Sequence, residues 1–235
     1  MSNIAEYVFP PPAVTSLPVA GSTARFPVRR IYCVGRNYLD HIRELGNNEK
    51  EPPLFFTKPR DAIVQDGATI PYASVTENFH FELELAVALQ SGAYNIAEEA
   101  ALTHVFGYAI ALDMTRRDLQ KQLSAKSAPW DVAKGFDHAC PCGTIHPVSQ
   151  VGHLNAGNIR MQVNGEVRQD SDLRAMIWNV PQIIAHLSAL FELQAGDIIL
   201  TGTPAGVGPV VPGDTMRGEI AGLGALTIHV GPRCV

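Results

Sequence analysis

The sequence is short of the features that mark membrane, secreted and nucleic-acid-binding proteins. No apolar run approaches the roughly twenty residues that a membrane span needs, and the N-terminus lacks a basic segment followed by an apolar core, so we expect no secretory leader. The 18 Lys and Arg residues form no cluster and are outnumbered by 23 Asp and Glu, for a net charge of −5. Nucleic acid is therefore an unfavourable partner. We expect a soluble, cytoplasmic protein that binds neither membrane nor nucleic acid.

Cysteine is also scarce, with only Cys33, Cys140, Cys142 and Cys234 in the chain. Four irregularly spaced cysteines are too few for a disulfide framework, and the Cys-Pro-Cys of residues 140–142 has neither zinc nor thioredoxin spacing. We expect all four to be reduced thiols.

Proline sets the first thirty residues apart from the rest. The run Phe9-Pro10-Pro11-Pro12, with Pro18 and Pro27, blocks helix and favours extended chain. We expect residues 1–30 to form a proline-rich arm laid over the body and residues 31–235 to form a single domain. The 235 residues, 46% of them hydrophobic, are ample for one large core.

Strand patterns dominate after the arm. Apolar, β-rich runs bounded by breakers predict strands at 31–35, 54–57, 81–89 and 105–113. Helical patterns are fewer, at 37–46, 96–104, 116–126 and 181–191. Asn164-Gly165 predicts a tight hairpin, and the frequent Gly and Pro of 196–232 predict brief strands in a rolled or barrel-like sheet. The predicted fold class is α+β and strand-dominated, with short flanking helices.

Two glutamates on one predicted strand are candidate metal ligands. Side chains alternate along a strand, so Glu82 and Glu84 share one face. An isolated Glu-x-Glu is more often part of a half-exposed strand, but this strand runs on into small apolar residues, and a cation would relieve the repulsion of two partly buried carboxylates. Asp113 ends the next strand, where it can point at the same place. Three hard oxygen ligands suit Mg²⁺ or Mn²⁺.

A predicted helix carries a second candidate group. His41 and Glu44 are three residues apart, so the carboxylate can orient the imidazole on one helical face and make a water-activating pair. A solvated helix with a salt-bridged Glu44 fits the same spacing. The preceding Gly-Arg36-Asn37 suits a loop that closes over a ligand, and we include Arg36 among the candidate substrate contacts.

The ordered motifs of residues 31–230 resemble the fumarylacetoacetate hydrolase superfamily. These motifs are YCVGRNYLDH, FFTKP, ELELAVAL, ALDMTRRDLQ, PWDVAKGFDH, VNGEVRQ and GDIILTGTPAGVGPV. The resemblance implies a mixed β-roll, a homodimer and Mg²⁺ or Mn²⁺ held by Glu82, Glu84 and Asp113. It makes 31–235 the catalytic domain. The arm resembles that of bacterial fumarylpyruvate hydrolases of gentisate degradation, a pathway of aromatic catabolism.

The resemblance also implies roles for polar residues outside the carboxylate group. The catalytic residues implied are His41, Glu44 and Lys134. The substrate contacts implied are Lys58, Arg117, Gln120 and Thr203. By itself, Lys134 before Gly135 would pass for a surface lysine. Arg116 departs from the smaller residue expected before Arg117, and it either alters the pocket or faces solvent.

The predicted activity is metal-dependent hydrolysis of the C–C bond of an acylpyruvate, with fumarylpyruvate as the leading substrate. A metal-chelated enolate of pyruvate is a competent leaving group, and water activated by His41 and Glu44 would attack the distal carbonyl. Oxaloacetate decarboxylation and isomerisation of 2-hydroxy-diene-dioates use the same chemistry and remain alternatives. So does a β-roll that binds a diacid without turnover. The His41–Glu44 pair favours hydrolysis.

Overall fold

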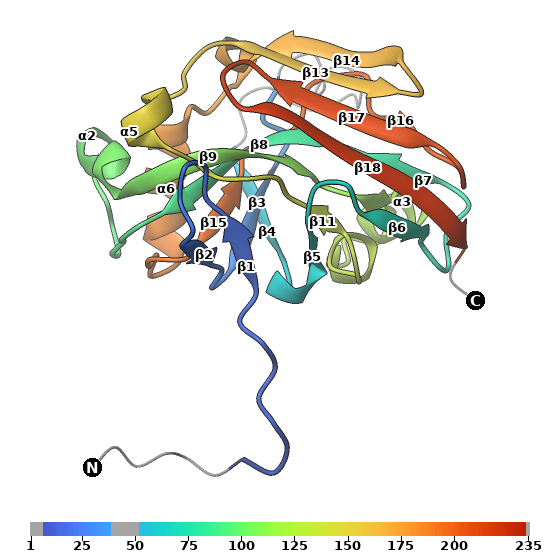
Figure 1. The fold of residues 1–235 in the computed structure, drawn as a ribbon, viewed down its shortest axis with the longest axis horizontal. Helices are drawn as coiled ribbons and strands as arrows, with labels where there is room; N and C mark the ends of the chain where they lie inside the picture. The colour runs from blue at the N-terminus through green and yellow to red at the C-terminus, as the bar shows by residue number, and fades with distance from the viewer. Residues whose placement is uncertain (1–6, 39–51, 234–235) are drawn as a thin grey trace.

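The computed structural model describes residues 7–38 and 52–233, and most of its elements are strands (Figure 1). The largest sheet has the order β12 (His146–Pro147), β9 (Val105–Leu112), β8 (Leu83–Leu89), β15 (Ile198–Leu200), β3 (Ile31–Gly35), β4 (Leu54–Lys58). The second has the order β14 (Glu166–Asp172), β13 (Asn158–Val163), β17 (Thr215–Ile220), β18 (Gly224–Arg233), β6 (Thr69–Tyr72).

Three smaller sheets complete the strands of the described ranges. They are β10 (Thr115–Arg116), β7 (Phe79–Phe81) and β16 (Gly208–Pro209); β11 (Cys140–Pro141) with β5 (Ile63–Val64); and β1 (Ser16–Pro18) with β2 (Arg25–Pro27). Among residues 7–38 and 52–233 none of these sheets closes into a barrel. The strand-dominated α+β prediction is confirmed, with an open set of sheets.

The helices are short and lie between strands. The α-helices are α2 (Glu98–Ala101), α3 (Arg117–Ala125), α4 (Asp131–Lys134), α5 (Val148–Val151) and α6 (Val180–Leu190). The 3₁₀ helices are η1 (Arg60–Ala62), η2 (Leu102–His104) and η3 (Leu173–Ala175). Within the described ranges no helix is long and apolar enough to cross a membrane.

Most predicted elements lie where the sequence placed them. Helix α6 begins with a capping box, in which the Asn179 side chain accepts from the Gln182 N–H and the Gln182 side chain accepts from the Asn179 N–H. The predicted hairpin forms between β13 and β14, with positive φ at both Asn164 and Gly165 as a type I′ turn requires.

The helix predicted for residues 37–46 does not begin at its predicted start. Asn37 is not helical, and its side-chain amide donates to the carbonyls of Trp178 and Thr201 at 2.9 and 2.7 Å. Tyr38 forms a β-bridge with Met176. The rest of that helix, from residue 39, lies outside the described residues.

The N-terminal segment has an exposed part and a packed part. Residues 7–11 run away from the body (Figure 1), and Tyr7, Val8 and Phe9 are largely exposed. The antiparallel pair β1–β2 packs Leu17 and Phe26 into the core. The division into an arm and a catalytic domain stays a prediction.

The cysteines that the structure describes, Cys33, Cys140 and Cys142, are buried free thiols. This agrees with the expected reduced state, and Cys234 lies outside the described residues.

The two large sheets pack face to face and enclose the core between them. One close contact joins β17 to β8, because a Cβ on Gly218 would lie 2.5 Å from Leu83 Cδ1. Leu83 is fully buried, and its two neighbours along the chain are the candidate ligands Glu82 and Glu84. The contact between the sheets therefore supports the strand that carries both glutamates.

We predict that Leu83→Ala lowers the free energy of unfolding by about 2–5 kcal/mol, since the truncation leaves a cavity between the two sheets. Urea unfolding followed by circular dichroism measures this change. Leu190→Ala is the matched control, because Leu190 is an exposed leucine, and its effect should stay below about 0.5 kcal/mol. Equal effects of the two substitutions would show that the inter-sheet contact contributes no stability.

Candidate metal centre and active site

Antiparallel pairing of β8 with β9 brings the candidate ligands together. The register pairs Leu83 with Leu112 and Glu84 with Ala111. One step further along, the Asp113 N–H donates to the Glu82 carbonyl at 2.8 Å. Asp113 follows the last residue of β9, so the strand ladder itself places it opposite Glu82.

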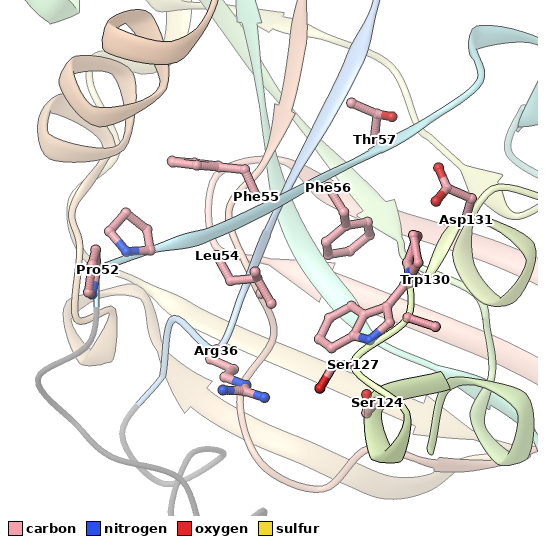
Figure 2. A pocket seen from close by; sticks show the side chains of 14 residues that line it. Arg36, Pro52, Leu54, Phe55, Phe56, Thr57, Ser124, Ser127, Trp130 and Asp131 are labelled. Atoms are coloured by element: carbon pink, nitrogen blue, oxygen red, sulfur yellow. The ribbon is translucent and has the colours of Figure 1, made fainter. Parts of the chain in front are cut away.

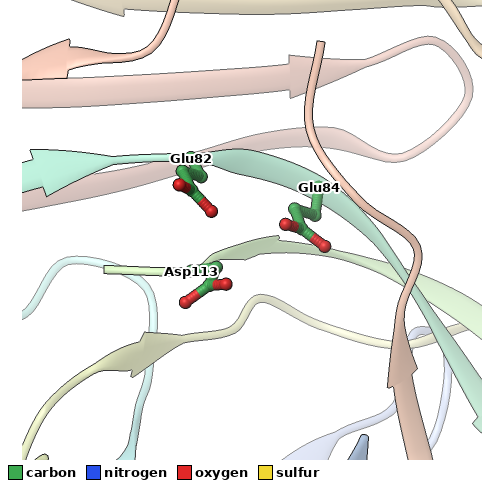
Figure 3. Close-up of side chains that lie close together, drawn as sticks. All are labelled: Glu82, Glu84 and Asp113. Atoms are coloured by element: carbon green, nitrogen blue, oxygen red, sulfur yellow. The ribbon is translucent and has the colours of Figure 1, made fainter. Parts of the chain in front are cut away.

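Glu82, Glu84 and Asp113 form one buried group. Each offers a carboxylate oxygen, and these oxygens all lie within 4.8 Å of one another. The two glutamates project from the same side of their strand toward Asp113 (Figure 3). Each residue exposes 5% or less of its surface. The alternation argument from the sequence therefore predicted the arrangement of these side chains.

Two lysines neutralise part of this buried charge. Lys134, the last residue of α4, donates to Glu82 Oε2 at 2.6 Å and to Asp113 Oδ2 at 2.7 Å. Lys58 Nζ lies 2.7 Å from Asp113 Oδ1 in an ion pair, and it donates to the carbonyls of Met114, at 3.1 Å, and Lys134. Lys134 thus lies between two carboxylates, and Lys58 links Asp113 to the Lys134 carbonyl at the end of α4.

Arg117 adds a third cation at the start of α3. Its Nη2 donates to Glu82 Oε1, its Nη1 donates to Gln120 Oε1 at 2.5 Å, and its Nε donates to His80 Nδ1 at 3.4 Å. Burial, together with the nearby charge of Arg117, lowers the pKa of His80 to about 4. A neutral imidazole can accept this hydrogen bond, so His80 and Gln120 orient the guanidinium.

Glu84 accepts a hydrogen bond from the backbone of the loop that follows β15. The Gly202 N–H donates to Glu84 Oε2 at 2.6 Å. Gly202 has φ of 93°, and a Cβ there would lie 2.7 Å from the Cβ of Asn37. Only glycine fits this turn without strain, so this residue type is needed for the contact with Glu84.

Burial and like charge act together on Glu84. Burial raises its pKa well above the usual value, and the charges of Asp113 and Glu82 raise it further. For Lys134, burial lowers the pKa, but the charges of Asp113 and Glu82 outweigh burial and the net pKa is raised. The site therefore keeps its ammonium group charged and carries carboxylates that a further cation would stabilise.

A cavity of about 300 Å³ opens onto the three carboxylates, and we call it the inner cavity. Of the predicted residues in the described ranges, those lining it are Arg36, Glu82, Glu84, Asp113, Arg117, Gln120, Lys134 and Thr203. Lys58 does not line it. Thr203 Oγ1 donates to the Leu83 carbonyl at 2.8 Å and accepts from Gln169 Nε2 at 2.8 Å. The hydroxyl of Thr203 is thus engaged with the wall of the cavity.

The catalytic pair predicted from the sequence and the position of Arg116 have different outcomes. His41 and Glu44 lie outside the described residues, so their catalytic role stays a prediction. Arg116 donates to the Val132 carbonyl at 2.9 Å and to Ser74 Oγ at 3.2 Å, and its guanidinium stacks over the Phe136 ring. It does not line the inner cavity, and its contacts fix it against neighbouring loops.

Several residues that line or support the inner cavity were not predicted. Lys121 had a usable signal, since it follows Arg117 by four positions and so shares its helical face. Phe56 and Trp130 also line the cavity. Gln169 is buried on β14 and donates to the Pro204 carbonyl at 2.7 Å. It ends the motif VNGEVRQ, but that motif alone does not indicate its role, because β14 reaches the site through the packing of the two sheets.

The side chains present fit a divalent cation with a preference for oxygen ligands. Three carboxylates from three separate positions converge without a cysteine or histidine among the grouped atoms, as Mg²⁺ and Mn²⁺ prefer. Burial, together with the charges of Asp113 and Glu82, raises the pKa of Glu84, and such a cation would relieve this cost of holding a buried carboxylate.

Comparison with known proteins identifies the family. Residues 30–231 match the protein family described as fumarylacetoacetate (FAA) hydrolase C-terminal. The chain belongs to this family, as the motifs indicated, and the predicted enzyme class, a hydrolase of carbon–carbon bonds, is confirmed.

The chain is similar to three known proteins with named activities. The chain is 47% identical to a fumarylpyruvate hydrolase from Pseudomonas aeruginosa whose crystal structure contains Mn²⁺ and pyruvate; the TM-score is 0.95, covering 97% of this chain and 100% of that one. It is 42% identical over 182 residues to the fumarylpyruvate hydrolase of Ralstonia sp, covering 77% and 94%. It is 41% identical over 202 residues to the mitochondrial oxaloacetate tautomerase FAHD1 of Homo sapiens, covering 86% and 91%. The Mn²⁺ in the first relative agrees with the predicted cofactor.

We predict that Lys134→Met binds Mn²⁺ more tightly than the unaltered protein when no substrate is present. Lys134 occupies oxygens of Glu82 and Asp113, and two cations within about 4 Å repel by several kcal/mol at an effective dielectric constant of about 20. A gain of about tenfold or more in affinity is expected by calorimetric titration. Lys126→Met, at an exposed lysine, should leave the affinity unchanged. Weaker Mn²⁺ binding by a folded Lys134→Met variant would contradict the prediction.

Proposed function

We propose that this chain catalyses the hydrolysis of an acylpyruvate, with fumarylpyruvate as the leading substrate and fumarate and pyruvate as the products. The observation that carries the proposal is the group of three buried carboxylates at the wall of the inner cavity, with Lys134 and Arg117 beside them. The relative from Pseudomonas aeruginosa, crystallised with Mn²⁺ and pyruvate, supports it, since pyruvate is one product of the proposed reaction.

The groups of the inner cavity suit a substrate with clustered oxygens. Glu82, Glu84 and Asp113 would hold Mg²⁺ or Mn²⁺, which supplies a Lewis acid that polarises the 2-oxo group and stabilises negative charge on the departing pyruvate. Arg117 presents a guanidinium oriented by His80 and Gln120, and a guanidinium binds a carboxylate in two parallel contacts. We assign Arg117 to the carboxylate of the pyruvate half.

The bond changes follow from the residues assigned. His41, oriented by Glu44, takes a proton from water, whose oxygen attacks the carbonyl carbon of the acyl group. Lys134 stabilises the negative charge that forms on that carbonyl oxygen. The C–C bond between the acyl carbon and the methylene of the pyruvate half then breaks, and the proton that His41 took from water passes to the methylene carbon. The products are a carboxylic acid and pyruvate.

A second candidate function is the conversion of oxaloacetate. The observation in its favour is the 41% identity with the oxaloacetate tautomerase of Homo sapiens, close to the 42% with the fumarylpyruvate hydrolase of Ralstonia sp. Oxaloacetate has four carbons and requires no room beyond the inner cavity. Fumarylpyruvate has seven, and a second cavity of about 740 Å³, which shares lining residues with the inner cavity, offers room for the longer chain.

Other features of the proposal rest on the sequence resemblance. These are the homodimer, the gentisate pathway and the cytoplasmic location, and each stays a prediction.

The decisive test is a panel of substrates assayed with and without EDTA. We expect release of pyruvate from fumarylpyruvate and acetylpyruvate, abolished by EDTA and restored by Mg²⁺ or Mn²⁺. Oxaloacetate is the comparison substrate, followed by loss of its enol absorbance and by release of CO₂. Turnover of oxaloacetate alone would overturn the proposal in favour of the second candidate, and metal-independent binding without turnover would favour a silent diacid-binding protein.

Two substitutions separate metal binding from catalysis. Glu82→Ala should weaken Mn²⁺ binding by at least about 100-fold and abolish turnover with it. His41→Ala should retain Mn²⁺ and lose about 10²–10⁴-fold in kcat. Calorimetry and steady-state kinetics measure the two effects, with Glu99→Ala, at an exposed glutamate, as the control. Loss of Mn²⁺ from His41→Ala would contradict the assignment of His41 as the base.

A further inference from the structure

A second cavity, of about 740 Å³, adjoins the inner cavity, and we call it the outer chamber. Figure 2 shows the side chains around it, which come from the end of β3, from β4 with the two prolines before it, and from residues 124–131. Its lining shares Gly35, Arg36, Phe56, Ser124 and Trp130 with the inner cavity. The two spaces therefore meet along a common wall, beside the carboxylates.

Aromatic rings stand at this common wall. The Lys134 ammonium lies 5.1 Å from the centre of the Phe56 ring, and Phe56 meets Trp130 edge to face at 5.9 Å between ring centres. Contacts run from the catalytic lysine through Phe56 to Trp130 without a break. A group that extends from a substrate held at Lys134 would pass directly over these rings.

Beyond the wall, the outer chamber is mostly apolar. Leu54, Phe55 and Pro129 line it along with Phe56 and Trp130. Leu54 remains 39% exposed on strand β4, so an apolar ligand would cover surface that now faces water. Thr57, Ser124 and Ser127 add hydroxyl groups to this lining, and a mainly apolar wall with some polar groups is usual for sites that bind small organic molecules.

Among the lining residues that the structure describes, two are charged, Arg36 and Asp131. Arg36 lies on the shared wall, with φ of 63°, and a strained backbone at a cavity is a frequent property of ligand sites. A short acyl group that ends in a carboxylate would meet Arg36 at this boundary. Further in, Asp131 contributes a negative charge, which disfavours a second carboxylate and leaves apolar groups as the suitable occupants.

We infer that the outer chamber is an acyl subsite, which extends the substrate range of this enzyme to acylpyruvates with flat, aromatic or long unsaturated acyl groups. The inference rests on the proposed function, because it takes the pyruvate half to lie at the carboxylates. The acyl group projects past Phe56, packs against Trp130 and covers Leu54. Water attack and C–C cleavage are unchanged, so an arylcarboxylate and pyruvate are the products from an aroylpyruvate.

Binding of inert ligands tests the subsite independently of turnover. The ligand 4-phenyl-2-oxobutanoate carries a 2-oxo acid and a phenyl group but lacks the second carbonyl that hydrolysis requires. With Mn²⁺ present, we expect it to bind at least about tenfold more tightly than 2-oxobutanoate by calorimetric titration, from burial of the ring. Equal affinities of the two ligands would overturn the inference.

A substitution that fills the outer chamber tests whether the phenyl group of the ligand binds there. Leu54→Trp places a large side chain in the outer chamber, and Leu54 does not line the inner cavity. It should remove most of the advantage of the phenyl ligand and lower the ratio of kcat/KM for benzoylpyruvate to that for acetylpyruvate by at least about tenfold. Leu190→Trp, at an exposed leucine of α6 outside both cavities, should leave both quantities unchanged.

The outcomes separate the two proposals. If no acylpyruvate is hydrolysed but the phenyl ligand binds more tightly and Leu54→Trp removes that gain, the proposed function fails and the subsite remains. If acylpyruvates are hydrolysed but the phenyl ligand has no advantage, or Leu54→Trp leaves the advantage intact, the subsite inference fails and the proposed function remains.

Discussion

The structure depends on the balance of charge around three buried carboxylates. Glu82, Glu84 and Asp113 contribute three carboxyl groups, and the ammonium groups of Lys58 and Lys134 with the guanidinium of Arg117 supply positive charge beside them. Removal of one partner from such a buried group leaves an uncompensated charge, at a cost of several kcal/mol. The elements that bring these residues together are β4, the consecutive strands β7 and β8, β9, α3 and α4. The fold holds six ionisable groups in one place where each alone would be unfavourable.

This balance also bears on what the site binds. A divalent cation adds two positive charges, and a dianionic acylpyruvate adds two negative ones, so metal and substrate together restore neutrality. Either alone leaves a net charge in a buried region. The oriented hydrogen bonds around Arg117 and the Gly202 contact with Glu84 keep these groups in position while charge is added. Under the proposed function, the metal and the diacid are therefore best regarded as one ligand in two parts.

The parts of the site that depend on residues close together in sequence could be predicted, and the parts that depend on contacts between distant segments could not. Alternation along one strand placed Glu82 and Glu84 together, and the end of the next apolar run placed Asp113 opposite. Lys134 looked like a surface residue because its burial depends on α4, β4 and the carboxylates, which are remote in sequence. Lys58 was expected to contact substrate, and its partners in the structure are Asp113 and two backbone carbonyls. Gln169 and Trp130 lie in the motifs VNGEVRQ and PWDVAKGFDH, but their place at the cavities was not predicted, since tertiary packing brings them there.

The two cavities differ in the structural elements that form their walls. The carboxylates of the inner cavity are placed by the register of β8 and β9, where a shift of one residue would reverse every side chain, so this part of the protein has little freedom to change. The outer chamber is lined by β4, an edge strand, and by the connection between α3 and α4. Edge strands and connections tolerate substitution and altered length far better than central strands. Evolution within such a family can therefore alter the acyl group accepted while the cleavage chemistry stays intact, and relatives of nearly equal identity are free to diverge in substrate.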